Sequence, residues 1–325
     1  MKRRMYIQTA LCGMIIGIAS CTQGELSADL QGGEGTDGAL NILGASLNTG
    51  AATRANESDR TLGLADDRIG IFLQADDANS YAAIDNRLYT YATPFWQTEE
   101  QLLLNTEAAQ LSAYYPYSAA YPSNPVLLRS QLYSTSADLC YTPFAASSSA
   151  SLVTLRLKHA YSRMKFTLKR DASLTTAGVI SRLTITGTGI RSVAQLDLFT
   201  ANDGSNGNIT DLPEVVAGVD LDLSAWLEDD RTISSTGAQI TVDGLFIPGA
   251  LTGDIGLTIA IDGVQKTGRV AATALCGSSG KLTAGKVYEV NLSVKEEKAL
   301  EFNSIKVVSG WDDFNSGTAV EGDTH

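Results

Sequence analysis

Apolar and polar residues alternate with a period of two along most of this chain. The clearest case is the segment in which Val153, Leu155 and Leu157 alternate with polar residues. The same alternation recurs at residues 164–169, 182–186, 219–224, 257–262 and 289–294. A segment of this kind puts one face on a core and the other in water, as the strands of antiparallel sheets do. The pattern therefore predicts an all-β protein.

Short turn sequences separate the predicted strands. The pairs Asp243-Gly244 and Asp262-Gly263 are typical of tight turns between strands. Helix is predicted for residues 98–110 and for one turn near residues 224–229. Many short strands in a chain of 325 residues predict two antiparallel β-sandwiches in tandem, over residues 39–172 and 173–325.

The first residues have the composition of an export signal. A basic start, Lys2 to Arg4, precedes an apolar run at residues 10–19, and Ser20 leads into Cys21. Residues 1–20 are therefore predicted to be a signal peptide. The small residues before Cys21 resemble the lipobox of bacterial lipoproteins, in which the signal is cut before the cysteine and the cysteine is acylated. The alternative is an ordinary signal peptide in which Cys21 has no role.

The region after the signal is predicted to tether a folded chain to a membrane. Residues 21–38 are polar and rich in glycine, a composition typical of a flexible spacer. No later apolar run is long enough to cross a bilayer as a helix. We therefore expect an outer-membrane lipoprotein at the cell surface, attached to the membrane through its lipid anchor.

Charge and histidine content argue against nucleic-acid binding and against catalysis. The 24 basic and 36 acidic residues give a net charge of −12, whereas phosphate backbones are bound by basic surfaces. One of the 2 histidines is the last residue, and the other, His159, is expected on the surface or in a loop because it follows Lys158. No pair of carboxylates stands out as catalytic. We predict a non-enzymatic protein without cofactor or metal site.

Two of the 4 cysteines are expected to remain in the folded chain. Cys12 belongs to the signal and Cys21 is the predicted lipid attachment site, which leaves Cys140 and Cys276. Because these two lie far apart in the sequence, we expect separate buried thiols, with a disulfide as the alternative.

Aromatic residues gather in one part of the chain. Trp96 precedes Tyr114 and Tyr115 by about twenty positions. Flat rings of this kind suit the stacking of sugar rings. Tyr and Trp often cap the core of a sandwich instead, and this is the interpretation that we favour. The stacking interpretation would make the protein a surface glycan-binding lipoprotein of an outer-membrane sugar uptake system.

Several motifs occur in a characteristic order between Cys21 and Trp311. They are Thr53-Arg54-Ala55, residues 67–73, Ala113-Tyr114-Tyr115-Pro116-Tyr117, His159-Ala160, residues 282–288 and Ile305-Lys306-Val307. Together they resemble the fimbrillin family of Bacteroidales. The resemblance implies transthyretin-like β-sandwiches, export as a lipidated precursor and assembly with other fimbrial subunits into a fimbrium.

The resemblance also implies a route of assembly. In the family an arginine-specific protease removes an N-terminal strand, and a strand of another subunit fills the groove that opens. In this chain the removable strand would be residues 40–47, with apolar Leu40, Ile42 and Leu47. The cleavage site would be Arg54 or, second in rank, Arg60. The alternative is a permanent strand followed by two surface arginines.

The C-terminal end carries the strand that could be exchanged. Ile305 and Val307 would lie in the closing or donor strand of the family. A stalk subunit needs such a strand to be free, whereas a tip or accessory subunit can keep it folded. The subunit type therefore stays open, as does the host or bacterial surface ligand that an adhesin would bind.

Overall fold

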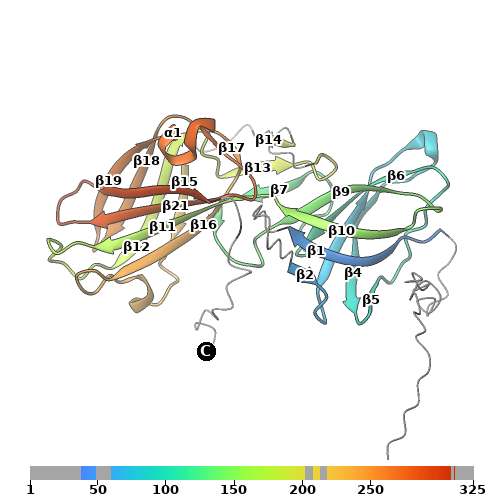
Figure 1. Ribbon diagram of the computed structural model, residues 1–325, viewed down its shortest axis with the longest axis horizontal. Coiled ribbons are helices and arrows are strands. Elements are labelled where there is room, and N and C mark those ends of the chain that lie inside the picture. Colours follow the sequence, from blue (N-terminus) through green and yellow to red (C-terminus); the bar gives the residue numbers. More distant parts are fainter. Residues whose placement is uncertain (1–37, 49–59, 202–207, 213–217, 309–310, 312–325) are drawn as a thin grey trace, which may run out of the picture. The chain divides into compact units, whose positions relative to one another are not determined.

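The computed structural model describes residues 38–48, 60–201, 208–212, 218–308 and 311. Within these ranges the chain is built of strands (Figure 1), so the predicted all-β class is confirmed. The predicted signal peptide, almost all of the spacer, Cys21 and Arg54 lie outside the described residues.

The N-terminal half of the chain forms an eight-stranded sheet of order β2-β1-β10-β9-β6-β3-β4-β5. Its strands are β1 (Asn41–Asn48), β2 (Arg60–Leu62), β3 (Arg68–Leu73), β4 (Ile84–Ala92), β5 (Phe95–Gln97), β6 (Ala109–Tyr115), β9 (Cys140–Ala146) and β10 (Leu152–His159).

The other sheets contain most of the C-terminal half. A five-stranded sheet of order β22-β21-β11-β16-β8 consists of β8 (Gln131–Leu132), β11 (Ser162–Arg170), β16 (Gln239–Phe246), β21 (Val287–Val294) and β22 (Glu301–Val308). A four-stranded sheet of order β15-β12-β18-β19 consists of β12 (Ile180–Thr188), β15 (Gly218–Asp222), β18 (Thr252–Ile261) and β19 (Val264–Ala271).

Smaller elements complete the fold. A three-stranded sheet of order β14-β13-β7 consists of β7 (Val126–Arg129), β13 (Val193–Leu196) and β14 (Ile209–Asp211). A two-stranded sheet consists of β17 (Gly249–Ala250) and β20 (Lys281–Leu282). The helical segments of the described chain are α1 (Ala272–Cys276), η1 (Asp77–Asn79), η2 (Asp229–Arg231) and η3 (Gly277–Ser279).

The helix predicted for residues 98–110 is wrong. Leu102 and Leu104 are buried and Leu103 between them is exposed, which is the alternation of an extended chain. The backbone of this segment pairs with the residues before β1, because the amide of Leu40 donates to the carbonyl of Leu102 and that of Leu104 to Gly38.

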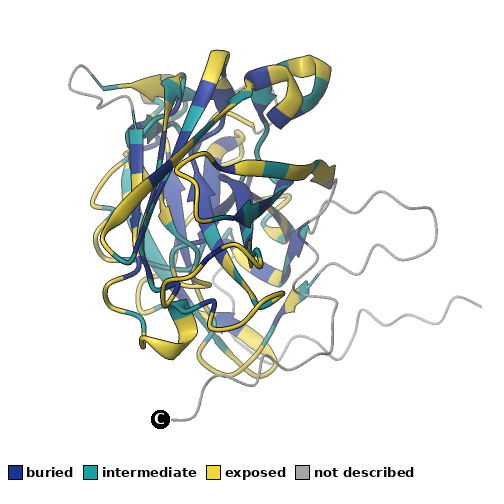
Figure 2. Ribbon diagram, turned by 90° about the vertical axis from the view of Figure 1, so that its left-hand side faces the viewer, coloured by how far each residue is buried: buried dark blue, intermediate teal, exposed yellow. Residues whose placement is uncertain are grey.

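Buried apolar residues form three clusters. One lies on the eight-stranded sheet, and a second is formed by side chains of the five- and four-stranded sheets. The third draws on β3, β6, β7, β9, β13 and β16 and includes Trp311. Figure 2 shows the buried residues gathered in the strands and the exposed residues mainly in loops and outer strands.

Strand pairing crosses the predicted boundary at residues 172 and 173. β11 lies before this boundary, yet it pairs along its length with β16 and in parallel with β21. The alternation of Met164, Phe166 and Leu168 predicted the strand but carried no information on its partners. The division into two tandem transthyretin-like sandwiches stays a prediction.

Candidate strand-exchange site

The strand predicted to be removable is β1. It lies between β10, to which it runs parallel, and β2, to which it runs antiparallel (Figure 1). Leu40 at its start and Ile42, Ala45 and Leu47 within it are buried, whereas Leu43 is 53% exposed. Ile42 and Ala45 can both point inward because the register shifts between Ile42 and Gly44. The strand therefore lies in a groove between β10 and β2 and turns its apolar face to the core.

β10, the strand beside β1, contributes buried leucines to the same face of the sheet. Ala45 pairs with Leu155 and Leu47 with Leu157, and both leucines are buried in the same cluster as β1. Burial of a leucine or isoleucine side chain contributes about 1.5–3 kcal/mol. Loss of β1 would expose the apolar residues that pack against its buried face, together with the unpaired backbone edge of β10. An edge of this kind binds another strand.

The two candidate cleavage sites differ in what the structure describes around them. Arg54 belongs to the segment 49–59 between β1 and β2, outside the described residues. Arg60 is half-buried and opens β2, where it pairs with Leu47. The peptide bond after Arg60 is thus part of a strand ladder. A protease would have to lift β2 from β1 to reach that bond.

The predicted C-terminal strand is β22. It is the end strand of the five-stranded sheet and pairs with β21. Ile305 is half-buried against the core, whereas Val307 is 37% exposed, so the side chains of β22 bury little area. Trp311, just beyond the strand, is fully buried, and its ring stacks on that of His159 with centroids 4.0 Å apart.

The aromatic residues proposed for sugar stacking are placed mainly in the interior. Tyr114 is fully buried and donates a hydrogen bond of 2.5 Å from its hydroxyl to Oδ1 of Asn86, and burial raises its pKa above the ordinary value. Trp96 is buried in a T-shaped contact with Tyr91, and with Leu40 it lines a hollow of about 270 Å³. Tyr115 is half-buried. This placement favours the interpretation in which the rings fill the core.

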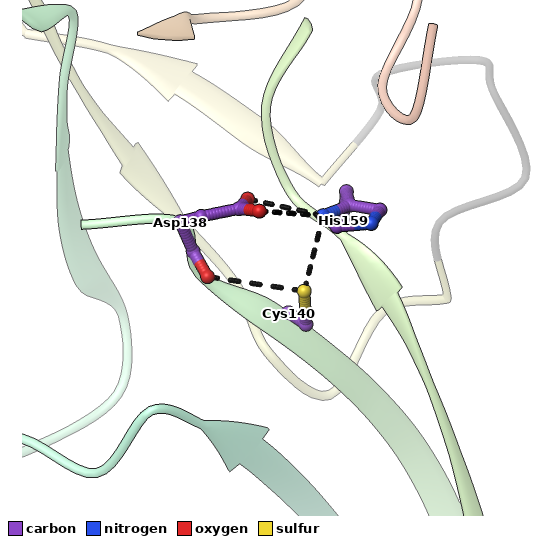
Figure 3. Close-up of side chains that lie close together, drawn as sticks. All are labelled: Asp138, Cys140 and His159. Atoms are coloured by element: carbon purple, nitrogen blue, oxygen red, sulfur yellow. Dashed lines mark hydrogen bonds and ion pairs between the residues drawn. The ribbon is translucent and has the colours of Figure 1, made fainter. Parts of the chain in front are cut away.

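The expectation of a surface histidine is wrong. His159 is 1% exposed and, as Figure 3 shows, its imidazole faces Asp138 and Cys140. The Nδ1 atom lies 3.0 Å from each carboxylate oxygen of Asp138 and 3.2 Å from the Sγ atom of Cys140. His159 follows Leu155 and Leu157 at intervals of two residues, so its side chain points to the same buried face of β10 as theirs. This interval of two residues can be read from the sequence, whereas the proximity of His159 to Asp138 and Cys140 cannot.

The expectation of two separate thiols is confirmed. Cys140 and Cys276 are both free and buried, on β9 and α1. Burial raises the pKa of Cys276 to about 12, and burial, with the nearby Asp138 carboxylate, holds the pKa of Cys140 well above its ordinary value. Both thiols are therefore protonated at neutral pH.

Comparison with known proteins places the chain in a family. The fimbrillin-like family matches residues 53–311, a range that includes Arg54, β22 and Trp311. The chain belongs to this family. The match confirms the resemblance inferred from the ordered motifs. No curated protein matches the sequence of this fimbrillin-like chain significantly.

Solved structures of proteins from Bacteroides species share the fold of this fimbrillin-like chain. A "putative cell adhesion protein" from Bacteroides ovatus has a TM-score of 0.55 and 16% identity, covering 85% of this chain and 98% of its own. A protein of the same description from Bacteroides uniformis has a TM-score of 0.53 and 20% identity, covering 85% and 100%. Among the described residues, no helix is long and apolar enough to cross a membrane.

Proposed function

We propose that the protein is a fimbrial subunit or tip adhesin that assembles by exchange of β-strands. The precursor would be exported, acylated at Cys21 and displayed on the outer membrane. Cleavage after Arg54, or after Arg60 as the second choice, would separate β1 from the rest of the chain. The observation that carries the proposal is that β1 buries an apolar face as a separate strand, with Arg54 in the segment that follows it and Arg60 at the start of β2.

Cleavage would make β1 exchangeable without unfolding the protein. Hydrolysis after Arg54 breaks the covalent link between β1 and β2, so that β1 is held by backbone pairing with β10 and β2 and by its buried face. A strand of another subunit offers the same backbone pairing and its own alternating apolar side chains. After exchange, the donated strand would pair with the edge of β10 and cover the apolar residues that β1 had covered.

The identity of the donated strand depends on the C-terminal end. β22 is an end strand with little buried side-chain area, so the release of its side chains costs little free energy. Trp311 opposes release, because exposing a fully buried tryptophan costs several kcal/mol. A subunit that keeps Trp311 in place would accept a strand without donating one, as a tip or accessory subunit does. We propose this closed state for the subunit before assembly.

A disulfide between β1 and β2 tests the exchange directly. Ser46 and Thr61 are partners in the antiparallel β1–β2 ladder, where Cα atoms lie about 4.5–5.5 Å apart, within reach of a disulfide. Thr61 follows both candidate cleavage sites, so the double variant Ser46→Cys/Thr61→Cys keeps β1 attached after either cut. Purified residues 22–325 would be oxidised, treated with an arginine-specific protease and assayed for polymers.

We expect the oxidised double variant to be cleaved but to remain monomeric, and to polymerise once a reductant is added. The single variant Ser46→Cys is the matched control and should polymerise under both conditions. Mass spectrometry verifies the disulfide and the cut. Polymerisation of the oxidised, cleaved double variant to the level of the control would refute exchange at β1.

A further inference from the structure

The three side chains that meet at the end of β10 have the chemistry of a metal site. Asp138, Cys140 and His159 offer a carboxylate, a sulfur and an imidazole, and their ligand atoms all lie within 4.8 Å of one another. All three residues are buried, with exposed fractions of 3%, 1% and 1%. Buried ionisable groups need partners that balance their charge. Cys140 also belongs to the buried apolar cluster that packs against β1, so this cluster adjoins the strand-exchange site.

The sheet and the turn before it bring the three residues together. Cys140 and His159 are direct partners in the antiparallel β9–β10 ladder. Asp138 lies at the end of the turn that precedes β9, where its amide donates to the carbonyl of Ser134. Trp311 then covers the ring of His159, with an angle of 9° between the two planes. The site is thus built on two paired strands and the turn before β9, and an aromatic side chain covers it.

The geometry differs from that of a catalytic cysteine–histidine pair. In such a pair the carboxylate binds one ring nitrogen and the thiol binds the other. Here the carboxylate oxygens and the sulfur all lie 3.0–3.2 Å from the same atom, Nδ1 of His159. Figure 3 shows the three side chains converging, with the main-chain oxygen of Asp138 also 3.8 Å from Sγ of Cys140. Convergence of several donors on one small volume is typical of metal coordination.

We propose that Asp138, Cys140 and His159 form a structural site for a zinc-class divalent cation. Thiolate and imidazole ligands select zinc over calcium or magnesium, and structural zinc sites are closed to solvent. Both oxygens of Asp138 face the site, so the carboxylate can fill two positions.

Charge balance supports the proposal. When the metal–sulfur bond forms, the S–H proton of Cys140 is released to solvent and Nδ1 of His159 donates its lone pair, with the ring proton on Nε2. One dication, one thiolate and one carboxylate then sum to zero, which suits a fully buried site.

The test uses residues 22–325, which lack Cys12 and Cys21. Because the ligands are buried, the metal has to enter before the fold closes, so the chain is unfolded and refolded with zinc(II) or cobalt(II). We expect one retained metal per chain after desalting and a rise of a few degrees in Tm over the chain refolded with chelator. Cobalt(II) should show a sulfur-to-metal charge-transfer band with tetrahedral d–d bands.

Matched cysteine variants show which thiol gives rise to the charge-transfer band. Cys276→Ser removes the other buried thiol and should keep the charge-transfer band, whereas Cys140→Ser should remove it. If Cys140→Ser does not fold, X-ray absorption of the zinc-loaded parent decides, with one Zn–S distance of about 2.3 Å expected. Failure of the refolded parent to retain metal, a zinc spectrum without sulfur, or a band that Cys276→Ser removes would overturn the proposal.

Discussion

At the scale of single residues, close packing fixes choices that the alternating pattern leaves open. Gly70 lies on β3 beneath the ring of Tyr114, and a Cβ atom at Gly70 would come within 2.0 Å of the ring atom Cε1. The buried Tyr114 ring is held by its hydrogen bond to Asn86 and cannot move aside freely. The glycine therefore permits an aromatic side chain to pack against the backbone of the neighbouring strand.

Substitution of Gly70 should therefore be destabilising. We expect Gly70→Ala to lower the free energy of unfolding by about 1–3 kcal/mol through overpacking. Gly44→Ala is the matched control, because no atom lies within 4 Å of a Cβ at that strand position, and its effect should stay within about 0.5 kcal/mol. Urea denaturation of both variants gives the comparison. Equal stability of the two variants would contradict the packing argument.

Burial of the two thiols gives a second prediction at this scale. Thiolate is the reactive form, and burial raises the pKa of Cys276 to about 12 and that of Cys140 well above its ordinary value. At pH 8 the folded residues 22–325 should therefore react with neither iodoacetamide nor Ellman's reagent. Both thiols should react after unfolding in guanidinium with chelator. Stoichiometric labelling of the folded chain at this pH would contradict the burial of these residues.

At the scale of elements, alternation predicted which segments are strands, and their pairing had to come from the structure. Leu40, Ile42 and Leu47 are buried as the sequence indicated for the removable strand. Parallel pairing of β1 with β10 joins segments about a hundred residues apart, and periodicity carries no information on such partners. In segment 98–110, predicted to be helical, the burial of three consecutive leucines alternates as in an extended chain.

The apolar face of β1 provides a test at this scale. Leu47→Ala should lower the free energy of unfolding by about 2–5 kcal/mol, because it opens a cavity in the N-terminal core. Leu43→Ala, on the same strand with its side chain 53% exposed, should change stability by about 0.5 kcal/mol or less. Thermal and urea unfolding of the uncleaved precursor measure both. A Leu43→Ala variant as destabilised as Leu47→Ala would show that β1 does not present the described face to the core.

At the scale of the whole molecule, the sequence predicted the fold class and the family, and it left the buried cluster unseen. Ordered motifs between Cys21 and Trp311 indicated the fimbrillin family, which the match to residues 53–311 confirms. The Asp138–Cys140–His159 cluster depends on the β9–β10 register and on the placement of Trp311. No sequence motif predicts that these residues lie close together, because strand register and the position of Trp311 are properties of the folded chain.

The central claim is that β1 is absent from assembled subunits. The most direct measurement is mass spectrometry of fimbriae sheared from the cell surface, with identification of the first residue of each subunit. The account predicts subunits that begin at Ala55, or at Thr61 if Arg60 is the site, and that lack the β1 peptide. Assembled subunits with an intact, acylated Cys21 N-terminus would contradict the account.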